Sequence, residues 1–310
     1  MRTRRPLAAA AALVAVASTT AATGRAELYD APRTSPVLSA APLDARYAAV
    51  RRDIEAARTT AARVHDGDRS RALSAFLTGG RRFLSFDARG GGRAVEVFGD
   101  LATADRVAVV VPGADGRLTN FDSWKWAGGG ARALHRQAGG RLAVVAWLGY
   151  ASPSTLSPSV LTPGRATGGA RELGRFVTGL HTVNGRARVA LLCHSYGTVV
   201  CAKTASRLGA LPVDAIALYG SPGVPAASAA DLKTTARVWA ARSDGDWTEY
   251  VPKVRFLGLG LGDDPVARSF GARRFDAGSG THAEYLKPGS RSLHNLALIA
   301  QARDQEVPHA

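Results

Sequence analysis

Downstream of residue 105, short continuous runs of apolar residues alternate with longer amphipathic stretches. Continuous apolar runs are typical of parallel strands buried on both faces, and the stretches between them are typical of helices. The alternation predicts an α/β fold in which helices cover both faces of a mostly parallel sheet. The expected strands span 106–111, 141–147, 188–193, 213–219, 236–241 and 272–275, and the expected helices span 122–138, 167–181, 196–208, 226–234 and 291–303.

The region before residue 105 has a different pattern. From Leu43 to Val64, apolar residues recur at intervals of four and three, which predicts an amphipathic helix, and a shorter helix is expected over 68–77. Strands at 82–87 and 94–98 flank the glycine run 90–92 and predict an opening β-hairpin. The first helix could bind a partner, but we expect it to pack on the sheet domain, because its alanine-rich stripe suits a coiled coil poorly.

The first residues have the pattern of an export signal. Three arginines at positions 2, 4 and 5 precede an apolar stretch, 6–17, which is too short to span a bilayer and is followed by small residues. Residues 3–7 also resemble a twin-arginine signal, which would direct export of the folded protein. We expect cleavage after Ala17 or Ala22 and a secreted protein, exported by the Sec or the twin-arginine route. An uncleaved N-terminal membrane anchor is the alternative.

These patterns divide the chain into five parts. We expect a signal peptide (1–26), a linker rich in proline, serine and alanine (27–42), an N-terminal helical extension (43–80), the sheet domain (81–304) and a short tail (305–310). Apolar residues make up 46% of the chain, which is enough for a sizeable core and excludes a disordered protein.

Charge and cysteine content narrow the possible partners. The formal net charge of +15 would suit an anionic partner. However, arginines greatly outnumber the five lysines, as in proteins of GC-rich genomes, and no basic run interleaved with aromatic residues follows the leader. We therefore expect no nucleic-acid binding. Cys193 and Cys201 are expected to be buried free thiols, because a strand end and the following helix hold them too far apart for a disulfide.

The segment 188–200 carries the strongest chemical signal. A buried strand runs directly into a helix, and Ser195 stands at the junction. This is the context of the nucleophile elbow, G-x-S-x-G, in which a strained turn exposes the serine hydroxyl above the sheet of an α/β hydrolase. Gly197 provides the second small residue, whereas Cys193 replaces the first glycine and is still small. The alternative is an ordinary serine cap at a helix N-terminus.

A serine nucleophile needs a histidine base. In this fold the base follows the nucleophile in the chain and lies on a loop after a strand. His282, in the loop after the last expected strand, meets both conditions, although an exposed loop histidine is the alternative. The other six histidines do not meet these conditions. Three of them precede the nucleophile in the chain: His65, His135 and His181. The elbow turns His194 away, His294 lies within a helix and His309 lies in the tail.

The acid that orients the base is expected after the strand 236–241. Asp246 is our choice and Asp244 is the reserve, because both follow the carboxyl end of that strand. Either aspartate could instead cap the next helix. Asp214 is excluded because it stands at the amino end of its strand.

The oxyanion hole requires two backbone N–H groups close to the developing charge. Tyr196, directly after the serine, is expected to supply one of them. The other should come from the loop after the strand 106–111, where Gly113 permits a turn and Ala114 is the expected donor. A plain glycine turn is the alternative. We expect no metal or other cofactor, since the triad mechanism needs none.

Six segments together resemble an actinobacterial α/β-hydrolase family that was long known only as a domain of unknown function. The resemblance covers roughly Phe83 to Ala302 and implies Ser195 as nucleophile and His282 as base. It favours Asp246, which stands just before Trp247, and the family usually has glycine where this chain has Cys193. The segments are VAVVVPGADG, AWLGY, GARELGRFVTGLH, LLCHSYGTVV, ALYGSPGV and GTHAEYLKPGSRSLHNLA.

The sequence thus predicts a secreted serine hydrolase that cleaves a carboxylic ester of a small molecule or lipid. The loop 150–165, at the active-site edge of the sheet, could form part of a lid or acyl pocket, or could be a simple connection. Two other functions stay open: acyl transfer to a cell-envelope sugar or lipid, with cell-envelope association, and an inactive binding or scaffold protein. The pattern leaves the oligomeric state and the ester undefined.

Overall fold

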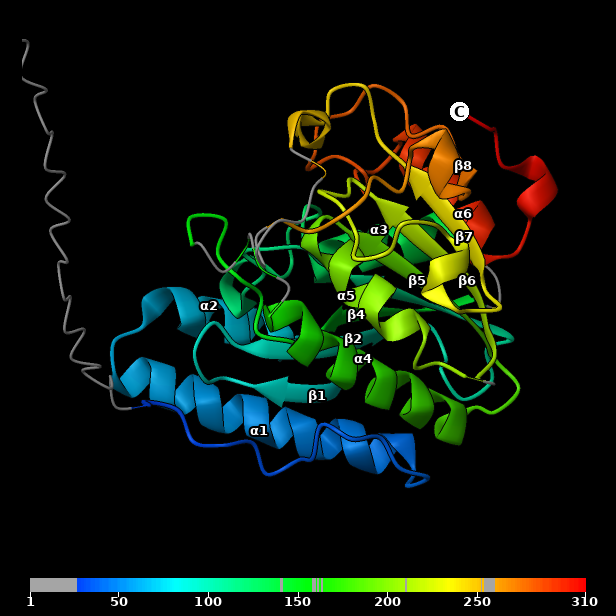
Figure 1. Cartoon of the computed structure of the whole chain (residues 1–310). Coiled ribbons are helices and arrows are strands. Elements are labelled where there is room, and N and C mark those ends of the chain that lie inside the picture. Colours follow the sequence, from blue (N-terminus) through cyan, green and yellow to red (C-terminus); the bar gives the residue numbers. More distant parts are fainter. Residues whose placement is uncertain are drawn as a thin grey trace, which may run out of the picture.

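A single mixed sheet forms the centre of the molecule (Figure 1). The structure is a computed structural model that describes residues 27–139, 142–157, 160, 162, 164–209, 211–251, 253 and 260–310, so the expected signal peptide, 1–26, lies outside the described residues. The strands are β1 (Arg82–Asp87), β2 (Arg93–Phe98), β3 (Arg106–Val111), β4 (Leu142–Leu148), β5 (Arg188–His194), β6 (Val213–Tyr219), β7 (Arg237–Ala241) and β8 (Arg273–Arg274).

The strand order is β1-β2-β4-β3-β5-β6-β7-β8. β1 and β2 form the predicted hairpin and β2 joins β4 antiparallel, whereas all pairs from β4 to β8 are parallel. The carboxyl ends of the parallel strands therefore meet at one edge of the sheet, where loops can assemble a site. The mostly parallel sheet with an opening hairpin, which the apolar runs predicted, is confirmed.

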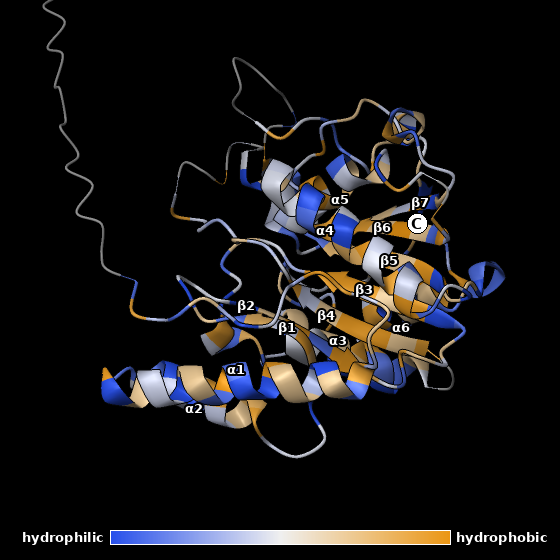
Figure 2. Ribbon diagram, turned by 90° about the horizontal axis from the view of Figure 1, so that it is seen from below, coloured by the Kyte–Doolittle hydropathy of each residue, from blue (hydrophilic) through white to orange (hydrophobic). Residues whose placement is uncertain are grey.

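Helices cover both faces of the sheet. Side chains alternate along β3, so that Ala108 and Val110 face one hydrophobic core while Val107 and Val109 face the other. α3 and α6 pack into the first core and α4 and α5 into the second. Figure 2 shows the hydrophobic residues concentrated in the central strands. The bounds are α1 (Leu43–Arg63), α2 (Gly67–Phe76), α3 (Ala127–Ala138), α4 (Gly164–Val183), α5 (Tyr196–Ala205) and α6 (Arg291–Ala300).

The N-terminal helical extension packs against the sheet, at the β1 edge (Figure 1). The stripe of α1 is buried at Val50, Ile54, Ala57 and Ala61. Residues 27–42 have no helix or strand, but they lie along α1, and the Arg46 guanidinium donates to backbone carbonyls of Ser35 and Val37 as well as of Leu84 in β1. The extension and the preceding segment are thereby fixed to the sheet domain.

Two expected helices differ from the structure. Over 226–234 the helix prediction is wrong: only a 3₁₀ turn forms, Ala230–Leu232, because the backbone pairs outside the segment, with the Ala229 N–H donating to the Phe270 carbonyl. The helix expected over 122–138 begins only at Ala127. Its first residues form turns instead, where the Asp122 carboxylate accepts hydrogen bonds from Arg81.

The expectation of two free thiols is also wrong. Cys193 and Cys201 form a disulfide, with their Cα atoms 6.5 Å apart. Since the chain reverses sharply at Ser195, α5 lies back alongside β5 and brings its second turn next to the strand end. The bond therefore connects the strand before the elbow with the helix after it.

We expect the Cys193→Ala/Cys201→Ala variant to unfold more easily than the wild type. The disulfide closes a loop between cysteines eight residues apart. Without it the unfolded chain gains conformational entropy, which lowers the free energy of unfolding by about 2.5 kcal/mol. Urea unfolding followed by circular dichroism measures this difference. Wild type unfolded in the presence of a reductant serves as the control and should match the variant. Equal stability of the oxidised wild type and the variant would contradict the expectation.

Candidate active site

Ser195 occupies a strained turn at the carboxyl end of β5. Its backbone has φ 53° and ψ −128°, a conformation that costs a non-glycine residue roughly 1–3 kcal/mol. Its N–H donates to the carbonyl of Tyr219 on β6, and its carbonyl accepts from the N–H of Thr198 in α5. The strand, the helix and the neighbouring strand together hold this conformation, as the nucleophile elbow requires.

Two glycines allow the elbow to form. A Cβ atom on Gly197 would lie 2.7 Å from the carbonyl oxygens of Val111 and Pro112, so only glycine lets α5 approach the end of β3. A Cβ atom on Gly113 would lie 2.6 Å from the Cβ of Ser195. The loop after β3 therefore lies directly against the serine side chain.

The loops after β7 and β8 bring an acid and an imidazole to this serine. A parallel bridge between Gly245 and Thr281 places the two loops side by side. His282 Nε2 lies 2.9 Å from the Oγ of Ser195, and its Nδ1 lies 2.9 Å from Oδ1 of Asp246. The serine, imidazole and carboxylate form one continuous hydrogen-bonded chain, although they stand up to 87 residues apart in sequence.

Asp246 is held as a buried carboxylate. Its side chain is only 2% exposed, and Oδ1 accepts from the N–H and hydroxyl of Thr248 while Oδ2 accepts from the Tyr285 hydroxyl at 2.6 Å. Burial by itself would raise the pKa of this carboxyl, but the hydrogen bonds from His282, Tyr285 and Thr248 together hold the pKa far below its usual range. Asp244, the reserve choice, is exposed and does not contact His282.

Sequence reasoning missed the residues that support this chain of contacts. Tyr285 not only donates to Asp246 but also accepts from the Ser243 N–H, and so ties the acid to the loop after β7. The Nε2 of His194 lies 2.8 Å from the carbonyl oxygen of His282, whereas it is the His282 ring that contacts the Ser195 hydroxyl. The sequence signal for Tyr285 is its position in GTHAEYL, where it follows the base His282 by three residues and can therefore also lie near the acid.

His194 is held in its neutral form. Its ring packs against both Tyr219 and Tyr285, with ring centroids 5.3 and 5.4 Å away, and its centroid lies 4.7 Å from that of the His282 ring. Burial, and next the nearby His282, lower the pKa of His194 to about 3. A neutral ring with its proton on Nε2 donates to the His282 carbonyl and thus holds the loop that carries the imidazole.

Because His194 stays neutral in the fold, acid should destabilise the protein through this residue. The unfolded chain binds a proton near pH 6.5, whereas the folded chain does so only near pH 3, so stability is full above 6.5 and falls as the pH drops below it. Between pH 7 and pH 5 we expect wild type to lose about 2 kcal/mol more stability than His194→Gln. Urea unfolding of both proteins at the two pH values tests this. Equal losses would contradict it.

The residues expected to form an oxyanion hole lie around the serine. Tyr196 is the first residue of α5, where backbone N–H groups have no partner within the helix, and its hydroxyl donates to the Thr162 carbonyl. Ala114 is buried in the loop after β3. The preceding carbonyl, that of Gly113, accepts from the hydroxyls of Tyr150 and Ser152, which fixes the loop. Both expected donors thus belong to segments that touch Ser195.

The described residues contain neither a candidate metal-binding cluster nor a candidate membrane-spanning helix. Within them, histidine, cysteine, aspartate and glutamate side chains form no group of three that could hold a metal ion. No helix in the described ranges is long and apolar enough to cross a membrane.

Two uncharacterized mycobacterial proteins are similar to this chain in sequence. An uncharacterized protein of Mycobacterium tuberculosis is 31% identical over 252 residues, which are 68% of this chain and 37% of the relative. An uncharacterized protein of Mycobacterium bovis is 34% identical over 145 residues, 43% of this chain and 53% of the relative. The chain therefore spans about two fifths to one half of the length of these relatives.

Two hydrolases are among the solved structures that match this chain. The esterase PE8 matches with a TM-score of 0.45 and 15% identity, over 66% of this chain and 96% of the esterase. The poly(3-hydroxybutyrate) depolymerase LpqC of Bordetella parapertussis matches with a TM-score of 0.46 and 13% identity, over 71% and 86%. A family model described as an alpha/beta hydrolase matches residues 87–256, more than half of the chain. The chain thus belongs to this family of α/β hydrolases.

Proposed function

We propose that this protein is a serine hydrolase that cleaves carboxylic esters. The observation that carries the proposal is the hydrogen-bonded chain from Ser195 through His282 to Asp246, assembled at a strained strand-to-helix turn. A serine hydroxyl is a weak nucleophile near neutral pH and needs a base that removes its proton, and the base needs a carboxylate that fixes its orientation. The distances of 2.9 Å from His282 to the serine hydroxyl and to the carboxylate support these roles.

In the proposed mechanism, Ser195 Oγ attacks the ester carbonyl carbon while His282 Nε2 takes the hydroxyl proton. Asp246 holds the other ring nitrogen in its protonated form and stabilises the imidazolium. The N–H groups of Ala114 and Tyr196 donate to the developing oxyanion. His282 then protonates the leaving alcohol, which yields an acyl-enzyme. A water molecule, deprotonated by His282, releases the acid and restores the serine.

We further propose that the protein is exported. The basic and apolar pattern of residues 1–26 motivates this, and the Cys193–Cys201 disulfide supports it, because disulfides persist mainly in oxidising compartments. N-terminal sequencing of the protein recovered from the culture medium tests the proposal. A new N-terminus after Ala17 or Ala22 is expected. Recovery only from the cytoplasm, with the first residues intact, would contradict it.

A panel of 4-nitrophenyl esters of increasing acyl-chain length tests the proposed reaction. The mature protein should release nitrophenol from at least part of the series, with saturation kinetics, and the chain-length profile defines the acyl preference. Ser195→Ala is the control and should give only the background rate. Hydrolysis that persists in this variant, or a panel without any turnover, would contradict the proposal.

A further inference from the structure

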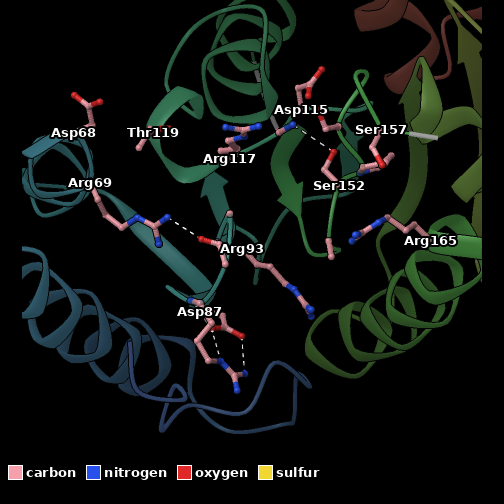
Figure 3. A pocket seen from close by; sticks show the side chains of 18 of the residues that line it. Asp68, Arg69, Asp87, Arg93, Asp115, Arg117, Thr119, Ser152, Ser157 and Arg165 are labelled. Atoms are coloured by element: carbon pink, nitrogen blue, oxygen red, sulfur yellow. Dashed lines mark hydrogen bonds and ion pairs between the residues drawn. The ribbon is translucent and has the colours of Figure 1, made fainter. Parts of the chain in front are cut away.

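A large open cavity lies on the hairpin side of the sheet (Figure 3). Its volume is about 1040 Å³. Ala94 at the start of β2 pairs with Leu148 at the end of β4, so the hairpin tip lies at the carboxyl edge of the parallel strands. Ser195 stands at the same edge, after β5. The cavity and Ser195 therefore lie at the same edge of the sheet.

Three arginines from separate elements line this cavity. Arg93 begins β2, Arg117 follows the oxyanion loop and Arg165 lies in the first turn of α4 (Figure 3). All three are exposed, and within the described part of the chain none of their guanidinium groups forms an ion pair. Exposed arginines outside ion pairs present fork-shaped donors to an incoming anion.

The remaining charges of the cavity already have partners. Arg89 pairs with Asp87, and the Arg69 guanidinium donates to the carbonyls of Ala88 and Gly90 in the hairpin tip. The other four acids each accept a hydrogen bond or ion pair: Glu27 from Tyr29, Asp66 from Arg69, Asp68 from Arg71 and Asp115 from Thr155. The formal charges of the lining residues balance, and Arg93, Arg117 and Arg165 are the lining cations that form no ion pair within the described residues.

A short loop connects the cavity to the serine. Ser152 lines the cavity, and its hydroxyl donates to the carbonyl of Gly113, the residue that lies against Ser195. Between β5 and β2 stand β3 and β4, so three strand spacings separate the serine from the hairpin, a distance of about 14 Å. One extended substrate can therefore reach both places.

We propose that this cavity binds an anionic group, a carboxylate or a phosphate, at the far end of the ester substrate. Arg93, Arg117 and Arg165 hold the anion while the ester carbonyl lies at Ser195. The inference rests on the proposed ester hydrolysis and narrows its substrate class to esters that carry a negative charge about 10–15 Å from the reacting carbon, the distance of two to three strand spacings. The anion belongs to either the acyl or the alcohol portion.

Calorimetric binding to the Ser195→Ala protein tests this without turnover. The probes are two esters of one chain length, monomethyl sebacate, which ends in a carboxylate, and dimethyl sebacate, which is neutral. Dodecyl phosphate and dodecanol form a second pair that separates phosphate from carboxylate recognition. We expect the anionic member of at least one pair to bind at least tenfold more tightly, and this advantage to disappear in Arg93→Gln/Arg117→Gln/Arg165→Gln.

A matched variant separates the site from the overall charge of the protein. Arg58→Gln/Arg63→Gln/Arg207→Gln removes three exposed arginines elsewhere and should keep the tenfold advantage. Thermal unfolding checks that both triple variants fold. Equal affinity within both pairs, no binding of either anion, or an equal loss in both triple variants would overturn the inference. Hydrolysis of neutral nitrophenyl esters by the wild type reports separately on the proposed function.

Discussion

Replacing His282 by alanine should lower kcat for ester hydrolysis by about 10⁵- to 10⁶-fold, because the serine then loses the base that removes its proton. The same change also removes the acid that protonates the leaving alcohol. The side chain is largely enclosed but not part of a hydrophobic core, so the variant should fold. Stopped and continuous assays with the best nitrophenyl ester measure the effect.

His181→Ala is the matched control, because His181 is an exposed histidine on α4 that does not contact the site. It should leave kcat within about twofold of the wild type, as surface substitutions usually do. Added imidazole should restore part of the activity of His282→Ala by entering the vacated space. A rate of His282→Ala close to that of wild type would remove this residue from the mechanism.

The second large effect is expected at the acid. Asp246→Asn should lower kcat by about 10⁴-fold, because the amide presents a donor to His282 Nδ1 and favours the ring tautomer that cannot accept the serine proton. Thr248 and Tyr285 donate hydrogen bonds to the Asp246 carboxylate, and in the variant these donors would no longer face a negatively charged acceptor. Measuring kcat and the circular dichroism spectrum of the variant distinguishes a catalytic defect from unfolding.

Asp244→Asn provides the comparison two residues away. Asp244 is exposed, and only its backbone is engaged, through the N–H that donates to the Gly278 carbonyl. We expect kcat to stay within about threefold of the wild type, as for other surface substitutions. The reverse ranking of the two variants would show that the other aspartate orients the base.

The sheet was predictable because its strands are long apolar runs. The runs at 106–111 and 213–219 match β3 and β6 residue for residue, since a strand buried on both faces admits few polar residues. The helix expected over 226–234 was not formed, because the pairing partner of that segment, near Phe270, lies far along the chain. Local alanine content could not reveal a contact of that range.

The triad residues were predictable because the fold fixes their order along the chain and places each of them after the carboxyl end of a strand. That rule selected Ser195, His282 and Asp246, which the structure places in contact. The supporting groups follow no such rule. The disulfide depends on how closely α5 lies along β5, and the bond from His194 to the His282 loop depends on the packing of its ring against Tyr219 and Tyr285. Neither arrangement leaves a pattern of residues along the chain.

The most direct test of the account is the covalent reaction of the elbow serine. A fluorophosphonate probe should modify the folded wild-type protein once, and mass spectrometry should locate the adduct on the peptide that contains Ser195. The label should be absent from Ser195→Ala and much slower in His282→Ala, which retains the serine but lacks the base. A folded wild type that stays unlabelled, as a scaffold protein would, or an adduct on another residue, would contradict the account.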